Sequence, residues 1–139
     1  MSKTFQFQVV APDQPAITEE ATTVILPGEL GEFGVMAGHM SFLSTLKPGT
    51  LRVVKGQERD LYFIAGGFAE VNAKSVIVLA EEYQLAAEID GTEAEKDKKQ
   101  ALEALAQKKD SADIASAKTL LARSEARLKA LQEAKAAKK

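Results

Sequence analysis

The chain has 139 residues, of which 45% are hydrophobic and 27% are charged, a composition typical of a folded globular protein. It contains no cysteine and one histidine, which excludes disulfides, thiol chemistry, iron–sulfur clusters and zinc sites built on several histidines. Its net charge of −2 argues against a general nucleic-acid-binding role, which needs a basic surface. No apolar run approaches the length of about 20 residues that a membrane-spanning helix requires. The N-terminus shows neither an apolar signal core nor an arginine-rich transit segment, so we expect the protein to stay where it is made.

The first half of the chain has the sequence pattern of short β-strands. Apolar and polar residues alternate from Phe5 to Val9, which predicts a strand with one buried face and one wet face. Further β-rich runs, separated by glycine and proline, predict strands at 24–26, 51–54, 61–64 and 76–79. We expect the runs without a polar residue to be central strands that are covered on both faces. The aromatic residues expected in the core are Phe5, Phe7, Phe63 and Phe68.

The second half has the composition of α-helices. Beyond Gly91 the chain contains no glycine and no proline, and it is rich in alanine, lysine, glutamate and leucine, which favour helix. Thr92 and Glu95 have the spacing of a capping box at the start of the first helix. Turn-forming residues at 110–113 predict a break between two helices. The expected organisation is an N-terminal antiparallel β-sandwich followed by a C-terminal antiparallel two-helix hairpin, with bounds of 1–87 and 88–139.

A narrow apolar stripe marks one side of the second predicted helix. Its members recur at intervals of three and four residues and are Ile114, Ala117, Leu121, Ser124, Leu128 and Leu131. The first helix offers little to match this stripe beyond Ala94, Ala101, Leu102 and Leu105. So little apolar area stabilises the hairpin only weakly against the entropic cost of ordering it. We therefore expect the hairpin to be stable only when docked, and to have more than one docked state.

Charge is distributed unevenly along the chain. Residues 1–87 carry six basic and ten acidic side chains, whereas residues 114–139 carry seven basic side chains against Glu125 and Glu133 alone. The last helix is therefore basic. This basic helix is either a solvated surface or a contact for an acidic partner, and both interpretations are open at this point.

The chain lacks the motifs of the common enzyme classes. The acidic pairs at 19–20 and 81–82 lie in the β-patterned half, and neighbouring side chains on a strand point to opposite faces and do not converge on one substrate. No nucleophile elbow, no Walker-type phosphate loop and no dinucleotide-binding glycine motif occurs. A small enzyme that uses Glu32 and His39 is disfavoured, because no third group supports them. We expect no catalytic residue, no metal site and no cofactor.

One glycine-rich segment stands apart from the predicted strands. Residues 27–39 contain four glycines within eleven positions, which indicates tight backbone turns on an exposed rim. The segment is either an ordinary turn with incidental charges or a contact surface. The side chains that it would offer to a partner are Glu29, Glu32, Phe33, Met36 and His39.

The same segment carries a resemblance to a known family. The stretch Gly31-Glu-Phe-Gly-Val-Met-Ala-Gly-His39 resembles the signature G-E-L-G-x-x-P-G-H of the epsilon subunits of bacterial F-type ATP synthases, with alanine in place of the usual proline. Further family motifs follow in order at 46–49, 64–71 and 76–80. The four motifs and the change to helix cover essentially the whole chain. The resemblance implies the same sandwich and hairpin in a non-catalytic subunit, bacterial or plastid-encoded.

The resemblance also implies a set of partners. Members of this family contact the gamma subunit and the ring of membrane c subunits, and they couple rotation to the catalytic head in ATP synthesis. The implied ring contacts are Glu29, Glu32, Phe33 and Met36, and the implied gamma contact is His39. In many bacterial members the hairpin inhibits ATP hydrolysis by meeting the catalytic β and α subunits through a basic face, here Lys118, Arg123, Arg127, Lys129 and Lys135. The implied location is the cytoplasmic face of the plasma membrane, where the subunit is held only through the complex.

Some family members bind ATP on the docked hairpin through an [IL]-D-x-x-R-A motif. This chain has Glu93 in place of the motif's arginine, and a carboxylate repels phosphate where a guanidinium attracts it. The resemblance thus implies at most a weak ATP site, made of Ile89, Asp90, Arg123 and Arg127. A second class of function also explains the composition: a stand-alone β-sandwich adaptor whose hairpin docks an unrelated protein partner.

Overall fold

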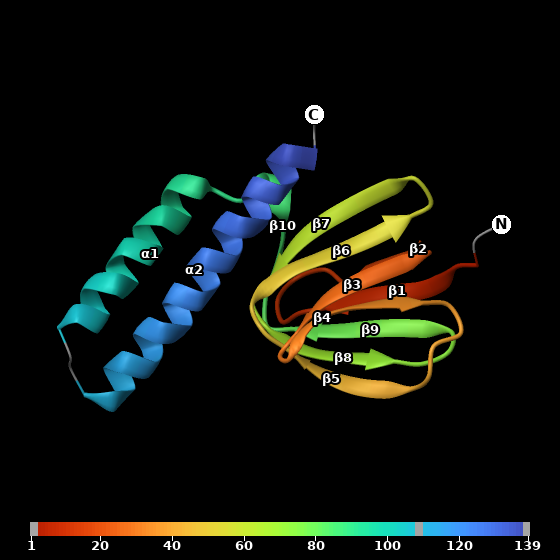
Figure 1. Cartoon of the computed structure of the whole chain (residues 1–139), viewed down its shortest axis with the longest axis horizontal. Coiled ribbons are helices and arrows are strands. Elements are labelled where there is room, and N and C mark those ends of the chain that lie inside the picture. Colours follow the sequence, from red (N-terminus) through yellow and green to blue (C-terminus); the bar gives the residue numbers. More distant parts are fainter. Residues whose placement is uncertain (1–2, 108–109, 138–139) are drawn as a thin grey trace.

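The computed structural model describes residues 3–107 and 110–137. Within them, strands form the N-terminal part and two long helices form the C-terminal part (Figure 1). The strands are β1 Phe5–Val10, β2 Ile17–Ala21, β3 Thr23–Gly28, β4 Gly31–Met36, β5 Phe42–Leu46, β6 Gly49–Lys55, β7 Glu58–Ile64, β8 Gly67–Val71, β9 Ser75–Ala80 and β10 Tyr83–Leu85. The helical elements are the 3₁₀ turn η1 Ala86–Glu88, α1 Gly91–Ala106 and α2 Ser111–Ala137.

The strands form one continuous sheet that folds over itself into a sandwich (Figure 1). Its order is β10-β7-β6-β3-β5-β8-β9-β1-β2, and β4 pairs with β3 beside this path. β3 and β5 share the single pair Gly28–Leu46, where the sheet passes from one layer to the other. Among the described strands all pairings are antiparallel except that of β1 with β9. The predicted sandwich and helical hairpin are confirmed, with one parallel pair that the local pattern did not predict.

The sandwich has a hydrophobic core of its own. Along β1 the side chains of Phe5, Phe7 and Val9 are buried, as the alternating pattern predicts. The buried members of this core lie between Phe5 and Ala80, so none of them comes from the helices. Because burial of one large apolar side chain contributes about 1.5–3 kcal/mol, this cluster is the main source of stability of the sandwich.

Two predictions about burial are wrong. Phe68 was expected in the core, but 57% of its surface is exposed, because it pairs with Leu79 on the outer face of β8 and β9. Leu79 is also exposed, so the run 76–79 is covered on one face only. The run 61–64 is buried throughout, as predicted. One face of this run is covered by α2 rather than by another strand, because Phe63 belongs to the buried cluster that includes residues of α2.

The N-terminus of α1 is capped by Asp90. Its Oδ1 atom accepts hydrogen bonds from the backbone amides of Thr92 and Glu93, at 3.0 and 3.2 Å. The predicted capping box of Thr92 and Glu95 is therefore wrong, because α1 begins at Gly91 with Asp90 as its N-cap, and Thr92 lies inside the first turn.

The hairpin packs on the sandwich through alanines. Figure 1 shows α2 between α1 and the sandwich. Ala126, Ala130 and Ala134 of α2 form a buried cluster with Leu61, Phe63, Ala65, Ala86, Ile89 and Leu131. The buried residues of α1 are Ala94 and Ala101, which agrees with the narrow apolar stripe. Each alanine buries little apolar area, so polar contacts matter more to docking than in a usual helix interface. Neither described helix is long and apolar enough to cross a membrane.

Candidate functional site

The first candidate contact residues lie at the tip of the hairpin formed by β3 and β4. Gly28 pairs with Gly31, and a two-residue turn of Glu29 and Leu30 joins the strands. A Cβ atom at Gly28 would lie 2.6 Å from the carbonyl oxygen of Gly31, and Gly31 has a φ of 136°. Both positions therefore require glycine. The turn projects Glu29 and Leu30 into solvent, and the fully exposed Leu30 is a residue that sequence reasoning missed.

The other predicted ring contacts lie along β4 and differ in exposure. Glu32 and Met36 are exposed, whereas Phe33 is half-buried. The ring of Phe33 packs edge-on against Phe42, with 5.6 Å between the ring centroids. The interpretation of residues 27–39 as a rim of tight turns is therefore only partly right. Much of the segment is strand, and strand alternation turns Phe33 towards the core.

An apolar patch on the outer face of β1, β5, β8 and β9 was not predicted. Phe68 and Val10 both pair with Leu79, and residues paired in this way share a face of the sheet. Together with Leu43 on β5 they leave large apolar side chains in water, with exposed fractions from 37% to 75%. We call Val10, Leu43, Phe68 and Leu79 the outer apolar patch. His39, the predicted gamma contact, is half-buried in the connection between β4 and β5.

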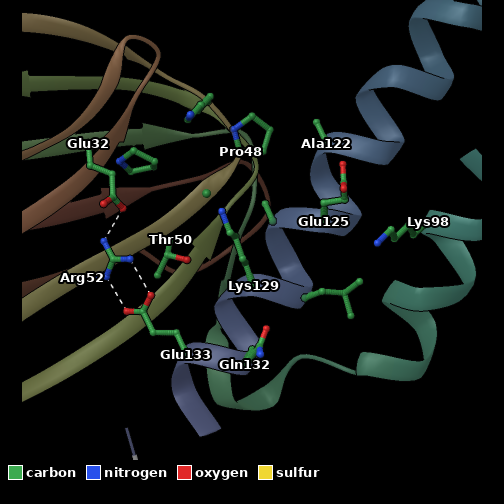
Figure 2. A pocket seen from close by; sticks show the side chains of 15 residues that line it. Glu32, Pro48, Thr50, Arg52, Lys98, Ala122, Glu125, Lys129, Gln132 and Glu133 are labelled. Atoms are coloured by element: carbon green, nitrogen blue, oxygen red, sulfur yellow. Dashed lines mark hydrogen bonds and ion pairs between the residues drawn. The ribbon is translucent and has the colours of Figure 1, made fainter. Parts of the chain in front are cut away.

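A cluster of four charged residues joins the sandwich to α2, and Figure 2 shows Glu32, Arg52 and Glu133 among them. Arg52 on β6 donates two hydrogen bonds to the carboxylate of Glu133 on α2, from Nε at 2.6 Å and from Nη2 at 2.7 Å. The Nη1 atom of Arg52 donates to Glu32 at 2.5 Å, and Arg59 on β7 donates to Glu133 at 2.9 Å. We call Glu32, Arg52, Arg59 and Glu133 the four-charge cluster. Three of its members line a cavity of about 660 Å³ between the sandwich and the hairpin.

The charge of Glu133 is held by its contacts. The hydrogen bonds from Arg52 lower the pKa of Glu133 below its ordinary value, although partial burial acts in the opposite direction. The same pairing with Glu133 raises the pKa of Arg52. A carboxyl group whose pKa is lowered by docking stabilises the docked state above its undocked pKa. This contribution is lost as the pH falls through the docked pKa.

We therefore expect the hairpin to stay docked as the pH falls past about 4.3, the ordinary pKa of glutamate, and to undock only at lower pH. The NMR signals of the Ala126 and Ala130 amides would report docking, and that of Ala69 in the core would report unfolding of the sandwich. In Glu133→Gln docking should be weaker at neutral pH and should lose this part of its pH dependence. A docking midpoint at or above the ordinary glutamate pKa would contradict the assignment.

Two residues of the predicted basic face bind the sandwich. Arg123 donates to Glu81 at 2.5 Å, and Arg127 donates to Glu82 at 3.0 Å. The guanidinium of Arg127 also lies over the ring of Phe63, 5.1 Å from its centroid. The expectation that Glu81 and Glu82 point to opposite faces of a strand is wrong, because they lie between β9 and β10 and both reach α2. The pair thus holds the second helix against the sandwich.

The other three members of the basic face are exposed on the docked hairpin: Lys118, Lys129 and Lys135. Lys138 and Lys139, which add to the charge of this part of the chain, lie outside the described residues. An acidic partner therefore finds three lysines accessible in this state. Arg123 and Arg127 become fully accessible only if α2 leaves the sandwich.

The structure brings together only part of the predicted ATP site. Ile89, Asp90 and Arg127 line a cavity of about 340 Å³, and Arg123 is not among its lining residues. Asp90 is engaged as the cap of α1, and Arg127 is already paired with an acid of the sandwich. The other charged residues of this cavity are acidic, Glu82 and Glu93. A triphosphate would therefore meet mostly negative charge.

A close-packed sandwich with an apolar outer patch, an exposed β-turn and a helical pair held by ion pairs defines a class of protein built for contacts with other proteins. Residues 4–86 match the family described as ATP synthase, Delta/Epsilon chain, beta-sandwich domain, and residues 87–132 match the corresponding long alpha-helix domain. The chain therefore belongs to the ATP synthase delta/epsilon chain family. Its relatives are non-catalytic subunits of the ATP synthase complex.

Relatives and solved structures agree with this membership. The chain is 42% identical over 113 residues to the ATP synthase epsilon chain of Bordetella parapertussis, covering 81% of each protein. It is 40% identical over 129 residues to that of Nitratidesulfovibrio vulgaris, covering 93% of this chain and 96% of that protein. A chain in the OSCP/F1/c-ring structure of the Euglena gracilis mitochondrial ATP synthase aligns with a TM-score of 0.71 and 28% identity, over 98% of this chain and 82% of that chain.

Proposed function

We propose that this epsilon-type chain joins the gamma subunit to the ring of c subunits in the central stalk of a proton-translocating ATP synthase. There it couples rotation of the ring to the catalytic head, without a catalytic residue of its own. The proposed location is the cytoplasmic face of a bacterial plasma membrane, where the complex holds the chain. The observation that carries the proposal is the outer apolar patch, because well-packed sandwiches rarely leave four large apolar side chains in water without a partner.

We assign separate surfaces of the sandwich to the two rotor partners. An apolar patch suits a lasting contact, so it is assigned to gamma together with His39. The exposed turn suits the polar loops of c subunits and is assigned to the ring. The close-packed core between these surfaces deforms little under load, as transmission of torque requires. The assigned ring contacts are Glu29, Leu30, Glu32, Phe33 and Met36.

We assign the hairpin, as a unit from residue 88 onwards, to inhibition of ATP hydrolysis. Its exposed lysines offer a first contact to an acidic segment of the catalytic β and α subunits. Undocking would add Arg123 and Arg127 to the same basic face. A sandwich core without helical residues supports this division, because the hairpin can leave without removing that core. The stand-alone adaptor explains the fold but not the family membership, so it is not favoured.

The proposal is tested with membrane vesicles that contain an ATP synthase from which the resident epsilon chain has been deleted. Addition of this chain should restore proton-driven ATP synthesis and keep the catalytic head attached to the membrane. The matched negative control is a vesicle preparation without added chain. Failure of the intact chain to restore either property would overturn the proposed function.

The isolated chain is expected to bind ATP only in the millimolar range or more weakly, which corresponds to about −4 kcal/mol or less favourable. The physical reason is the mostly acidic lining of the cavity beside Asp90. Glu93→Arg should strengthen whatever binding exists, because it replaces a repulsive charge by an attractive one. Titration calorimetry measures the affinity of both chains for ATP. Micromolar affinity of the unchanged chain would contradict this expectation.

A further inference from the structure

The four-charge cluster connects two surfaces that we assigned to different partners. Glu32 lies on β4 in the segment assigned to the ring, and Glu133 lies on α2 of the hairpin. Figure 2 shows Arg52 between them, with hydrogen bonds to both carboxylates. One guanidinium therefore touches both the segment that we assign to the ring and the helix that we assign to inhibition.

We propose that Arg52 is a positioning residue that couples docking of the hairpin to engagement of Glu32 by a cationic group of a partner. The identity of that partner rests on the proposed function. The ion pair between Arg52 and Glu133 lies within the isolated chain, so its effect on docking can be tested without any other subunit.

The contact between Arg52 and Glu133 has the geometry of a strong ion pair. Two parallel N–H groups meet the two oxygens of one carboxylate, which adds directional specificity to the attraction. The side chains are only 17% and 30% exposed, so water and salt screen the pair less than a fully exposed one. Glu125 on the same helix lines the same cavity and is exposed, with no ion pair to any residue in the described part of the chain. It is therefore a natural control.

The direction of the coupling follows from the sharing of Arg52. Glu32 and Glu133 are both negative and both form an ion pair with the guanidinium of Arg52. Each carboxylate therefore weakens the ion pair between Arg52 and the other carboxylate. A partner cation that neutralises Glu32 leaves Arg52 to Glu133 alone, which favours the docked hairpin. Because coupling is reciprocal, a docked hairpin also leaves Glu32 more available to that cation.

Arg59 also stabilises docking of the hairpin, but it does not connect Glu32 to Glu133. It donates one hydrogen bond to Glu133 from β7, and it is 47% exposed. Among the ion pairs of the described residues it has none with Glu32. Loss of Arg59 should therefore weaken docking and leave the effect of Glu32 in place, whereas loss of Arg52 should remove both.

The absence of cysteine from the chain permits a direct assay. A single thiol introduced as Ala126→Cys lies in the buried cluster between α2 and the sandwich, so its rate of reaction with a thiol reagent measures the open fraction. Glu133→Gln and Arg52→Gln should each raise this rate about tenfold, within the range usual for coupled sites. The double variant should react no faster than the faster single one, since both changes break the same contact. Glu125→Gln should leave the rate unchanged.

The coupling itself is tested by Glu32→Gln, which imitates neutralisation by a partner. The rate at Ala126→Cys should fall in this variant, and the fall should vanish when Arg52→Gln is added. A parallel reporter, Ala69→Cys in the sandwich core, should be unaffected throughout, because only the hairpin moves. The proposal is overturned if Glu133→Gln behaves like Glu125→Gln, if Glu32→Gln leaves the rate unchanged or raises it, or if both reporters accelerate together. None of these results depends on binding to gamma or to the ring.

Discussion

A chain that ends at Glu88 is expected to fold, to bind gamma and to raise ATP hydrolysis by a reconstituted catalytic head. The buried core of the sandwich is complete by Ala80, so a cooperative unfolding transition should persist. If the hairpin acts as a brake, its removal should increase hydrolysis at least about fivefold, the lower end of the usual coupling between sites. An ATPase assay of the head with gamma and either chain length measures this effect.

The same truncation should have a measurable cost in stability. It uncovers Leu61 and Phe63, which α2 covers in the intact chain. Exposure of these two apolar side chains should lower the free energy of unfolding by roughly 3–6 kcal/mol, which denaturant titration measures. If the hairpin only packs on its own sandwich, stability will fall and hydrolysis will stay unchanged. That result would contradict the regulatory assignment.

Charge reversal can separate inhibition of ATP hydrolysis from docking of α2 on the sandwich. Reversal of Arg123, Arg127 and Lys129 to glutamate should release much of the inhibition, but the two arginines also hold the helix against the sandwich. Reversal of the exposed lysines alone, Lys118, Lys129 and Lys135, is the matched variant that leaves these docking contacts in place. Both sets should raise hydrolysis if the basic face contacts an acidic partner. Added salt should weaken the native brake for the same reason.

The double variant Glu32→Lys with Phe33→Ala is expected to abolish most of the attachment of the catalytic head to the membrane sector. It reverses one charge and removes one apolar contact on the strand assigned to the ring. The change is not a pure surface change, because Phe33 packs against Phe42 and Glu32 pairs with Arg52. We expect the isolated chain to lose about 1–2 kcal/mol of stability while staying folded, less than the 3–5 kcal/mol typical of a fully buried phenylalanine.

A cleaner companion to this variant is Leu30→Ser. Leu30 is fully exposed at the tip of the turn, so its replacement should leave the unfolding transition unchanged. Proton-driven ATP synthesis and retention of the head on vesicles should both decrease. Unchanged synthesis in Leu30→Ser and in the double variant would remove the ring assignment from this turn.

Local pattern predicted some strands well and missed others for identifiable reasons. β1 and β7 were predicted because alternation or a continuous apolar run marks them. β2 was missed because Glu19 occupies a half-buried position on its inward face and breaks the apolar alternation, and β4 was missed because glycine interrupts it at the edge of the sheet. The parallel pairing of β1 with β9 joins segments almost seventy residues apart, and no local pattern encodes such a contact. The exposure of Phe68 has a local cause, because strand alternation places it on the same face of β8 as the exposed Glu70 and opposite the buried Ala69 and Val71.

The contact residues could be named from the resemblance, but the contacts between them could not. Glu81 and Glu82 have an ordinary sequence context, and their arginine partners lie more than forty residues away. The pairing of Arg52 with Glu133 spans eighty-one positions and depends on where the hairpin docks. The replacement of arginine by Glu93 was visible at once, because it alters a short motif.

Binding of the intact chain to purified gamma tests the central claim most directly. Calorimetry should show one chain per gamma, and Phe68→Ser with Leu79→Ser should weaken the complex at least about tenfold, since buried apolar anchors carry much of the energy of an interface. The control Leu102→Ser removes an equally exposed leucine from α1, outside the outer apolar patch, and should bind as the unchanged chain does. Absence of binding by the intact chain, or equal binding by all three chains, would contradict the account.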